Sequence, residues 1–195
     1  DLTLGELYLD KCLTLDSTNF WYADLQAQIL LYNKKIPQAI DVYEKMLRMY
    51  PKKSNIYYSL VNLYLNNKDV EKTKQMLTKI EQLQGKNEAI AMTYFNLYRS
   101  NNDWDGALKY LVDFDKEYQS ARVESIIGDL YADRFNDTLA IKYYNKALAL
   151  DNQYAPALCG KAEVYRLKGD YPTFFTTVKP FISNAQYPSK VKNEY

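Results

Sequence analysis

Residues 139–158, LAIKYYNKALALDNQYAPAL, carry a pattern from which the architecture of the whole chain can be predicted. Ala140 and Ala147 are small and stand two helical turns apart, with the large Tyr144 between them. An Asp-Asn break at 151–152 then leads into a new apolar run. Small residues at this spacing let a neighbouring helix approach closely. The stretch therefore predicts a helix packed tightly against others.

The same pattern recurs along the chain at intervals of 33 or 34 residues. The position of Ala140 forms a first column: Ala39, Thr73, Ala107, Ala140 and Phe174. A large residue four positions later forms a second: Tyr43, Leu77, Leu111, Tyr144 and Val178. A third column is mostly tyrosine and is predicted to lie in the core: Leu30, Tyr64, Tyr98, Tyr131 and Tyr165. A period of this length is typical of stacked helical repeats.

Each repeat reads as a helix, a tight turn and a second helix. Apolar residues recur every three or four positions in AIDVYEKML (39–47), as one face of a helix requires. Pro37 and Pro172 stand at the start of second helices, where a missing N–H is tolerated. Aspartates that precede second helices are predicted to cap them: Asp69, Asp103 and Asp170.

The pattern resembles the tetratricopeptide repeat, whose signature covers 34 positions. The fourth repeat matches six of its columns, with Asn in place of the final Pro: Gly128, Tyr131, Ala140, Tyr144, Ala147 and Asn152. The fifth repeat departs from it, since Phe174 and Phe181 replace small residues and Pro180 is predicted to interrupt the second helix. The resemblance implies an all-α fold, a right-handed superhelical solenoid of antiparallel helix-turn-helix repeats with about 11 helices.

The columns also predict how the chain is divided. We expect one solenoid domain over residues 1–195, a segment of a longer repeat array whose neighbouring repeats are partners of this one. The predicted divisions are a partial repeat at 1–19, repeats at 20–53, 54–87, 88–120, 121–154 and 155–187, and a tail or next repeat at 188–195.

Composition argues against several classes of function. Lys plus Arg number 25 and Asp plus Glu 24, so no strong positive field is expected to attract nucleic acid. The chain has no apolar run near ~18 residues, so we expect no membrane insertion by this segment. Histidine is absent, which removes the commonest acid–base residue and metal ligand. Two cysteines, Cys12 and Cys159, are too few for a disulfide framework or a zinc site, and Cys12 is predicted to be buried.

The resemblance implies that a ligand binds on the concave wall, which in the family is built from first helices. Helical phase assigns ten residues to that wall: Gln28, Tyr58, Asn62, Met92, Asn96, Arg99, Arg122, Asp129, Glu163 and Arg166. Asn62 and Asn96 are predicted to bind a peptide backbone, Tyr58 and Met92 to receive side chains. Arg99 with Arg122 is expected to hold a carboxylate.

Three functions follow from these residues. The leading hypothesis is a non-catalytic protein-interaction scaffold that binds a peptide or partner protein on the concave face. The alternative is a small-ligand or glycan binder of the exported bacterial type, which needs aromatic residues exposed together on one wall. The candidates are Trp21, Tyr22 and Tyr58, or Trp104 and Tyr110 on a second helix. An enzyme using two of the carboxylates of Asp129, Asp133 and Glu163 is the third, but no pocket-forming motif or nucleophile accompanies them.

One type of peptide ligand, the C-terminal tail of a chaperone, is not expected for this scaffold. In the family's chaperone-binding members, a Lys at position five of the first repeat holds a C-terminal carboxylate, and no repeat here has Lys at that position. We therefore do not expect this chaperone clamp. Because histidine and an accompanying nucleophile are absent, we also expect no enzyme, cofactor or metal. The localisation stays open between the cytoplasm and the periplasm of a bacterium.

Overall fold

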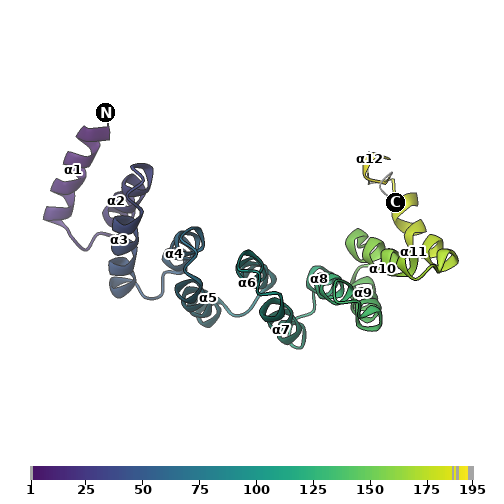
Figure 1. Ribbon diagram of the computed structural model, residues 1–195. Helices are drawn as coiled ribbons and strands as arrows, with labels where there is room; N and C mark the ends of the chain where they lie inside the picture. Colours follow the sequence, from purple (N-terminus) through teal and green to yellow (C-terminus); the bar gives the residue numbers. More distant parts are fainter. Residues whose placement is uncertain (1, 186, 188, 193–195) are drawn as a thin grey trace. The chain divides into compact units, whose positions relative to one another are not determined.

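The structure is a computed structural model that describes residues 2–185, 187 and 189–192, and these residues form helices joined by short turns (Figure 1). They contain no strand, so the prediction of an all-α fold is confirmed. Eleven helices of 12 residues or more, α1 to α11, are followed by the one-turn α12. The chain divides into two compact units, residues 1–86 and 87–195, and each is described by itself. The single domain stays a prediction.

The first unit contains two complete helix pairs preceded by one helix. Its helices are α1 (Leu2–Leu15), α2 (Phe20–Tyr32), α3 (Ile36–Met49), α4 (Ser54–Asn66) and α5 (Val70–Gln84). Helix α2 packs against α3 and α4 against α5, with a further contact of α3 with α4. Ala27, Met46 and Leu60 are fully buried in the core that these helices share. Cys12, predicted to be buried, is half-buried, and the helix α1 that carries it packs mainly against α2.

The second unit contains three helix pairs. Its helices are α6 (Glu88–Ser100), α7 (Trp104–Asp115), α8 (Ala121–Ala132), α9 (Asp137–Leu150), α10 (Ala155–Leu167), α11 (Tyr171–Ser183) and α12 (Ser189–Lys192). Helix α9 packs against both α8 and α10, and α8 also contacts α10 directly. Ala140 and Ala147 are completely buried at this junction, as their spacing predicts.

The turns and caps follow the repeat closely. Asp69, Asp103 and Asp170 each accept a hydrogen bond from a backbone N–H in the first turn of a second helix, so the predicted caps are confirmed. Asn136 does the same for α9. Three caps of first helices were not predicted: Asn19, Asn87 and Ser120.

The prediction that Pro180 interrupts the last long helix is wrong. Helix α11 continues through Pro180 to Ser183. A proline removes one helical hydrogen bond, but only three residues of the helix follow it here. Val178 and Phe181 are buried on either side of Pro180, and this packing holds the final turn in place.

The tyrosine column is buried less uniformly than predicted. Tyr64 is buried in the first unit, whereas Tyr131 and Tyr165 are half-buried and pack against the edges of the cores. Tyr98 is also half-buried and stacks on Tyr94 with a ring-centroid distance of 6.5 Å. The high tyrosine content is therefore largely a packing feature.

A further column appears only in the backbone. The turn between the two helices of each repeat contains one residue in the left-handed region, and these residues recur with the repeat period: Lys34, Lys68, Asn102, Phe135 and Gly169. Only the last is glycine, the residue that adopts this conformation without steric cost. Phe135, at φ 55° and 91% exposed, combines this strain with an aromatic side chain in water.

We predict that Phe135→Gly stabilises the chain. Glycine relieves the left-handed strain, and little packing is lost because the ring is exposed. The expected rise in the free energy of unfolding, measured by urea titration, is about 0.5–1 kcal/mol. Asn102→Gly is the control and should gain less, because Asn tolerates this conformation better than Phe. A loss of stability in Phe135→Gly would contradict this account.

The ring of Tyr144 determines how α8, α9 and α10 meet. A Cβ atom added to Gly128 on α8 would lie 2.6 Å from Cε1 of Tyr144, and one added to Gly160 on α10 would lie 2.6 Å from Cζ. Since the two glycines belong to different helices, the ring lies against the backbones of both. Tyr144 is only 1% exposed, so it has no room to move away from either helix.

We predict that the effect of Gly160→Ala changes sign with residue 144. With Tyr144 present, the added methyl clashes with the ring, and the expected loss of stability is about 1–3 kcal/mol. In a Tyr144→Leu background the contacted atoms Cε1, Cζ and Oη are absent, so alanine's higher helix propensity should make the same change favourable.

Urea unfolding of the four proteins of this double-mutant cycle measures the effect. Gly5→Ala is the control, because a Cβ at Gly5 meets nothing within 4 Å. Equal losses from Gly160→Ala in both backgrounds would refute the proposed contact.

Candidate functional site

A hollow of about 590 Å³ opens between the first helices α8 and α10, with α9 behind them. Three carboxylates contribute to its lining: Asp129, Asp133 and Glu163. Apolar side chains form other parts of it: Ala132, Val164 and Leu167. The volume is within the range usual for ligand-binding clefts. Asp129 and Glu163 were predicted as wall residues, and the structure brings them to one hollow.

Asp129 is held in place by the core tyrosine behind it. The hydroxyl of Tyr144 donates a hydrogen bond to Oδ1 of Asp129, with an O···O distance of 2.7 Å. Asp129 is an exposed residue, and it lines the hollow. Partial desolvation of its carboxyl, together with the nearby charge of Asp133, raises the pKa of Asp129 to about 6, although the hydrogen bond from Tyr144 acts in the opposite direction.

Glu163 has a different environment on the facing helix. Arg166 forms two contacts with it, from Nε to Oε2 at 2.7 Å and from Nη2 to Oε1 at 2.5 Å. The hydrogen bonds and charge of Arg166 hold the pKa of the Glu163 carboxyl below its usual value. Glu163 and Arg166 were both predicted as wall residues. They form a charge-balanced ion pair at the edge of the hollow.

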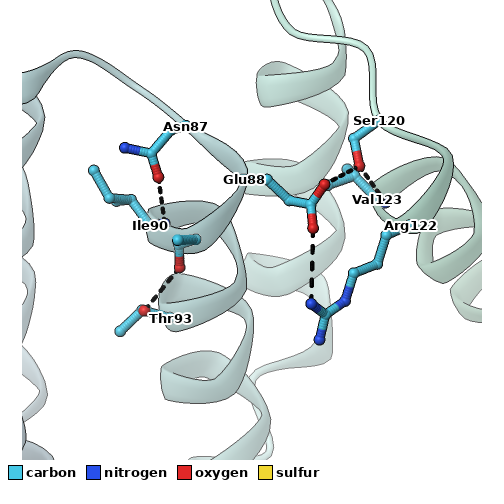
Figure 2. Close-up of polar contacts among 8 residues, drawn as sticks. Asn87, Glu88, Ile90, Thr93, Ser120, Arg122 and Val123 are labelled. Carbon is cyan, nitrogen blue, oxygen red and sulfur yellow. Dashed lines mark hydrogen bonds and ion pairs between the residues drawn. The ribbon is translucent and has the colours of Figure 1, made fainter.

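The prediction that Arg99 and Arg122 together hold a ligand carboxylate stays a prediction. Arg122 already faces a carboxylate of the chain itself, with Nη1 3.7 Å from Oε1 of Glu88 (Figure 2). The same Glu88 accepts a hydrogen bond of 2.7 Å from the hydroxyl of Ser120, the residue that caps α8 (Figure 2). Arg99 is exposed and lies over the ring of Phe95.

Met92 is not on the surface as predicted. It is 8% exposed and packs in the core of the second unit with Leu111 and Phe114. The first helix α6 turns this face toward α7 and α8, and the same repeat position is also buried in the next two repeats, at Ser125 and Cys159. Asn96, one turn later on α6, is exposed.

The predicted wall residues of the first unit lie on α2 and α4. Gln28 is exposed and donates a hydrogen bond of 2.7 Å to Oδ2 of Asp24. Tyr58 donates through its hydroxyl to Oε1 of Gln84 at 2.8 Å. Asn62 is exposed. These side chains are accessible, but each unit is described by itself, so Asn62 and Asn96 are not assigned to one groove.

The aromatic residues that a glycan site requires are not arranged as a flat platform in the first unit. Trp21 is exposed, and its ring meets Phe20 edge-on, at an interplanar angle of 86°. Tyr22 is half-buried, and the hydroxyl of Tyr58 is bonded to Gln84. No observation at these residues favours the glycan alternative.

A second group of ionisable side chains is buried where α7, α8 and α9 meet. Glu124 is 2% exposed and Asp115 is 7% exposed. The ammonium of Lys146 lies 2.6 Å from Oδ2 of Asp115 and over the ring of Tyr143. One oxygen of each carboxyl, Oδ1 of Asp115 and Oε2 of Glu124, has no hydrogen-bond partner. Burial first, and then the neighbouring Asp115, raise the pKa of Glu124 to about 7.

We predict that Glu124 makes stability fall as the pH rises. A carboxyl whose folded pKa is raised favours the protonated folded state, so its contribution is complete below about pH 4.5 and is lost as the pH rises through 7. Glu124→Gln keeps a neutral side chain that can donate to Asp115. The variant should exceed the wild type at pH 8 by on the order of 1 kcal/mol, and much less at pH 5.

Thermal unfolding at pH 5, 6, 7 and 8 measures this difference. Asp129 has a raised pKa as well, so only the comparison between wild type and variant isolates Glu124. Parallel pH profiles for the two proteins would contradict the assignment.

Two other kinds of site are absent from the described residues. Within residues 2–185, 187 and 189–192, no group of three Cys, Asp or Glu side chains is arranged to hold a metal ion. Among the helices of that same part of the chain, none has the length and apolar character needed to cross a bilayer.

Of the ten residues that line the hollow, only Asp129 and Glu163 were predicted as wall residues, and two of the others matter most. Tyr144 was assigned to packing alone, yet its hydroxyl orients Asp129. Leu167 was not assigned at all, although it lines the hollow and is 71% exposed. A large apolar residue at the exposed end of a first helix was the available signal in the latter case.

Comparison with known proteins gives the same architecture. The family model described as tetratricopeptide repeat matches residues 126–154. A BBSome complex member BBS4 homolog from Drosophila melanogaster is 24% identical over 159 residues, which make up 80% of this chain and 33% of that protein. The chain therefore spans about a third of the length of this curated relative.

Solved structures with similar folds include several repeat proteins. YrrB, described as a TPR protein with an unusual peptide-binding site, has a TM-score of 0.57 at 16% identity, with 89% of this chain and 90% of that chain covered. Yeast Tom70 has a TM-score of 0.58 at 18% identity, with 92% and 39% covered. Pseudomonas aeruginosa pilF has 0.57 at 13%, with 86% and 77% covered. These identities establish likeness of fold alone.

Proposed function

We propose that this chain, whose fold is that of tetratricopeptide-repeat proteins, is a non-catalytic protein-interaction scaffold that binds an extended segment of a partner protein. The observation that carries the proposal is the hollow between α8 and α10. It lies on first helices, and it combines carboxylates with an accessible apolar surface. Peptide-binding sites commonly pair these two features, because apolar contacts supply affinity and polar groups fix orientation.

Three features of the hollow suit a peptide. Its volume of about 590 Å³ accommodates more than one side chain. Leu167, 71% exposed, offers an apolar contact that an occupant would remove from water. Asp129 and Glu163 are held by Tyr144 and Arg166, so little side-chain freedom is lost when a ligand binds.

Likeness to YrrB adds limited support. YrrB has a similar fold and is described as having a peptide-binding site. At 16% identity that site does not transfer residue by residue. The proposal therefore depends on the hollow of this chain and on none of the relatives' ligands.

Panning a random 12-residue peptide library on the purified chain tests the proposal. Selected peptides should bind the hollow, and Leu167→Ala should weaken them about fivefold, since it removes roughly 1 kcal/mol of apolar contact. Leu150→Ala is the matched control, because Leu150 is also an exposed helix-terminal leucine but does not line the hollow.

Fluorescence anisotropy gives the affinities, and amide NMR shifts locate the peptide. Failure to select any peptide, or equal effects of the two leucine variants, would sink the proposal.

A further inference from the structure

We infer that the segment bound in the hollow presents lysine or arginine side chains to Asp129 and Asp133. This inference rests on the proposed peptide-binding function and adds the chemistry of the occupant. Among the residues that line the hollow are three carboxylates and no lysine or arginine. Charge complementarity with such a surface favours a cationic partner over a neutral or acidic one.

Asp129 and Asp133 differ from several other acidic residues of the second unit, because those residues form ion pairs with lysine or arginine. Several carboxylates there face a basic side chain from a neighbouring helix: Asp105–Arg134 at 2.8 Å, Asp115–Lys146 at 2.6 Å and Asp137–Lys168 at 3.8 Å. The ion pairs of the described residues include neither Asp129 nor Asp133. These two stand one helical turn apart, so their charges reinforce each other.

A basic side chain of the partner would stabilise the negative charge of the Asp129 carboxylate. Partial desolvation and the charge of Asp133 raise its pKa, and the hydrogen bond from Tyr144 only partly offsets this, so no positive charge in the described part of the chain balances its ionised form. Tyr144 donates to Oδ1 only, so the remaining acceptor positions face the hollow. An ammonium or guanidinium group placed there would form a charge-assisted hydrogen bond.

The rest of the lining suits the stem of the same side chain. Lysine and arginine carry three or four methylene groups that pack on apolar surface while the charged head reaches a polar group. Ala132, Val164 and Leu167 provide that surface within the same hollow. Glu163 is already balanced by Arg166, so it contributes an acceptor at the edge with little excess charge.

Affinity of the selected peptides for charge variants of the chain tests this inference. Lysine and arginine should be enriched in the selected peptides, and replacing one basic residue by Gln should weaken binding about tenfold. Asp133→Asn should have a comparable effect, and Glu117→Gln, an exposed acidic position outside the hollow, should have none. Binding should also weaken as salt is raised from about 0.05 to 0.5 M, by roughly the same order.

A charge exchange makes the test specific. Asp133 is exposed, so Asp133→Lys should fold normally, and it should bind a selected peptide whose basic residue has been replaced by Glu better than it binds the original peptide. Circular dichroism and the urea midpoint verify the fold of each variant.

The outcomes separate this inference from the proposed function. Peptides that lose affinity with Leu167→Ala but lack basic residues and ignore Asp133→Asn would overturn the inference and leave the peptide-binding function intact. If the library yields no peptide, both fail. If Asp133→Lys does not bind the Glu-containing peptide better than the original peptide, direct contact between the peptide's basic residue and Asp133 is contradicted.

Discussion

The close approach of α8 and α10 to the ring of Tyr144 is the constraint on which the described site depends. Gly128 and Gly160 leave no Cβ at the two places where the ring meets their helices, and Ala140 and Ala147 let α9 come near enough to insert it. The ring is thereby fixed, and its hydroxyl reaches Asp129. A packing residue of the repeat therefore also orients a carboxylate that lines the hollow.

Helices α7 to α10 and the turns between them also contain the main ion pairs and unpaired carboxylates of the second unit. Most interhelical carboxylates there contact a lysine or arginine, as in the pairs of Asp105 with Arg134 and Asp115 with Lys146. Glu124 is the buried exception, with a pKa raised by burial and by Asp115, and it links the stability of this unit to pH. Asp129 and Asp133 are accessible exceptions, and they give the hollow the negative charge from which we infer a basic ligand.

Much of the architecture follows from local rules that can be applied to a sequence. The spacing of Ala140, Tyr144 and Ala147 predicts helices that pack closely, and Asp103 and Asp170 predict where second helices begin. Pro180 was misread, because tertiary burial of Phe181 outweighs the single hydrogen bond that proline removes. The strain at Phe135 was invisible, because four of the five residues in that turn column are not glycine.

The sequence by itself determined the helix period, the caps and the columns of small and large residues, because each depends on neighbours within one or two turns. It also placed Asp129 and Glu163 on first helices. Tertiary structure decided how the predicted wall residues are placed: packing against α7 and α8 buries Met92, whereas Arg122 stays exposed with its guanidinium 3.7 Å from a carboxylate oxygen of Glu88. It also brought Leu167 and Tyr144 to one hollow with Asp129, since contacts between helices depend on how whole faces pack and not on spacing along the chain.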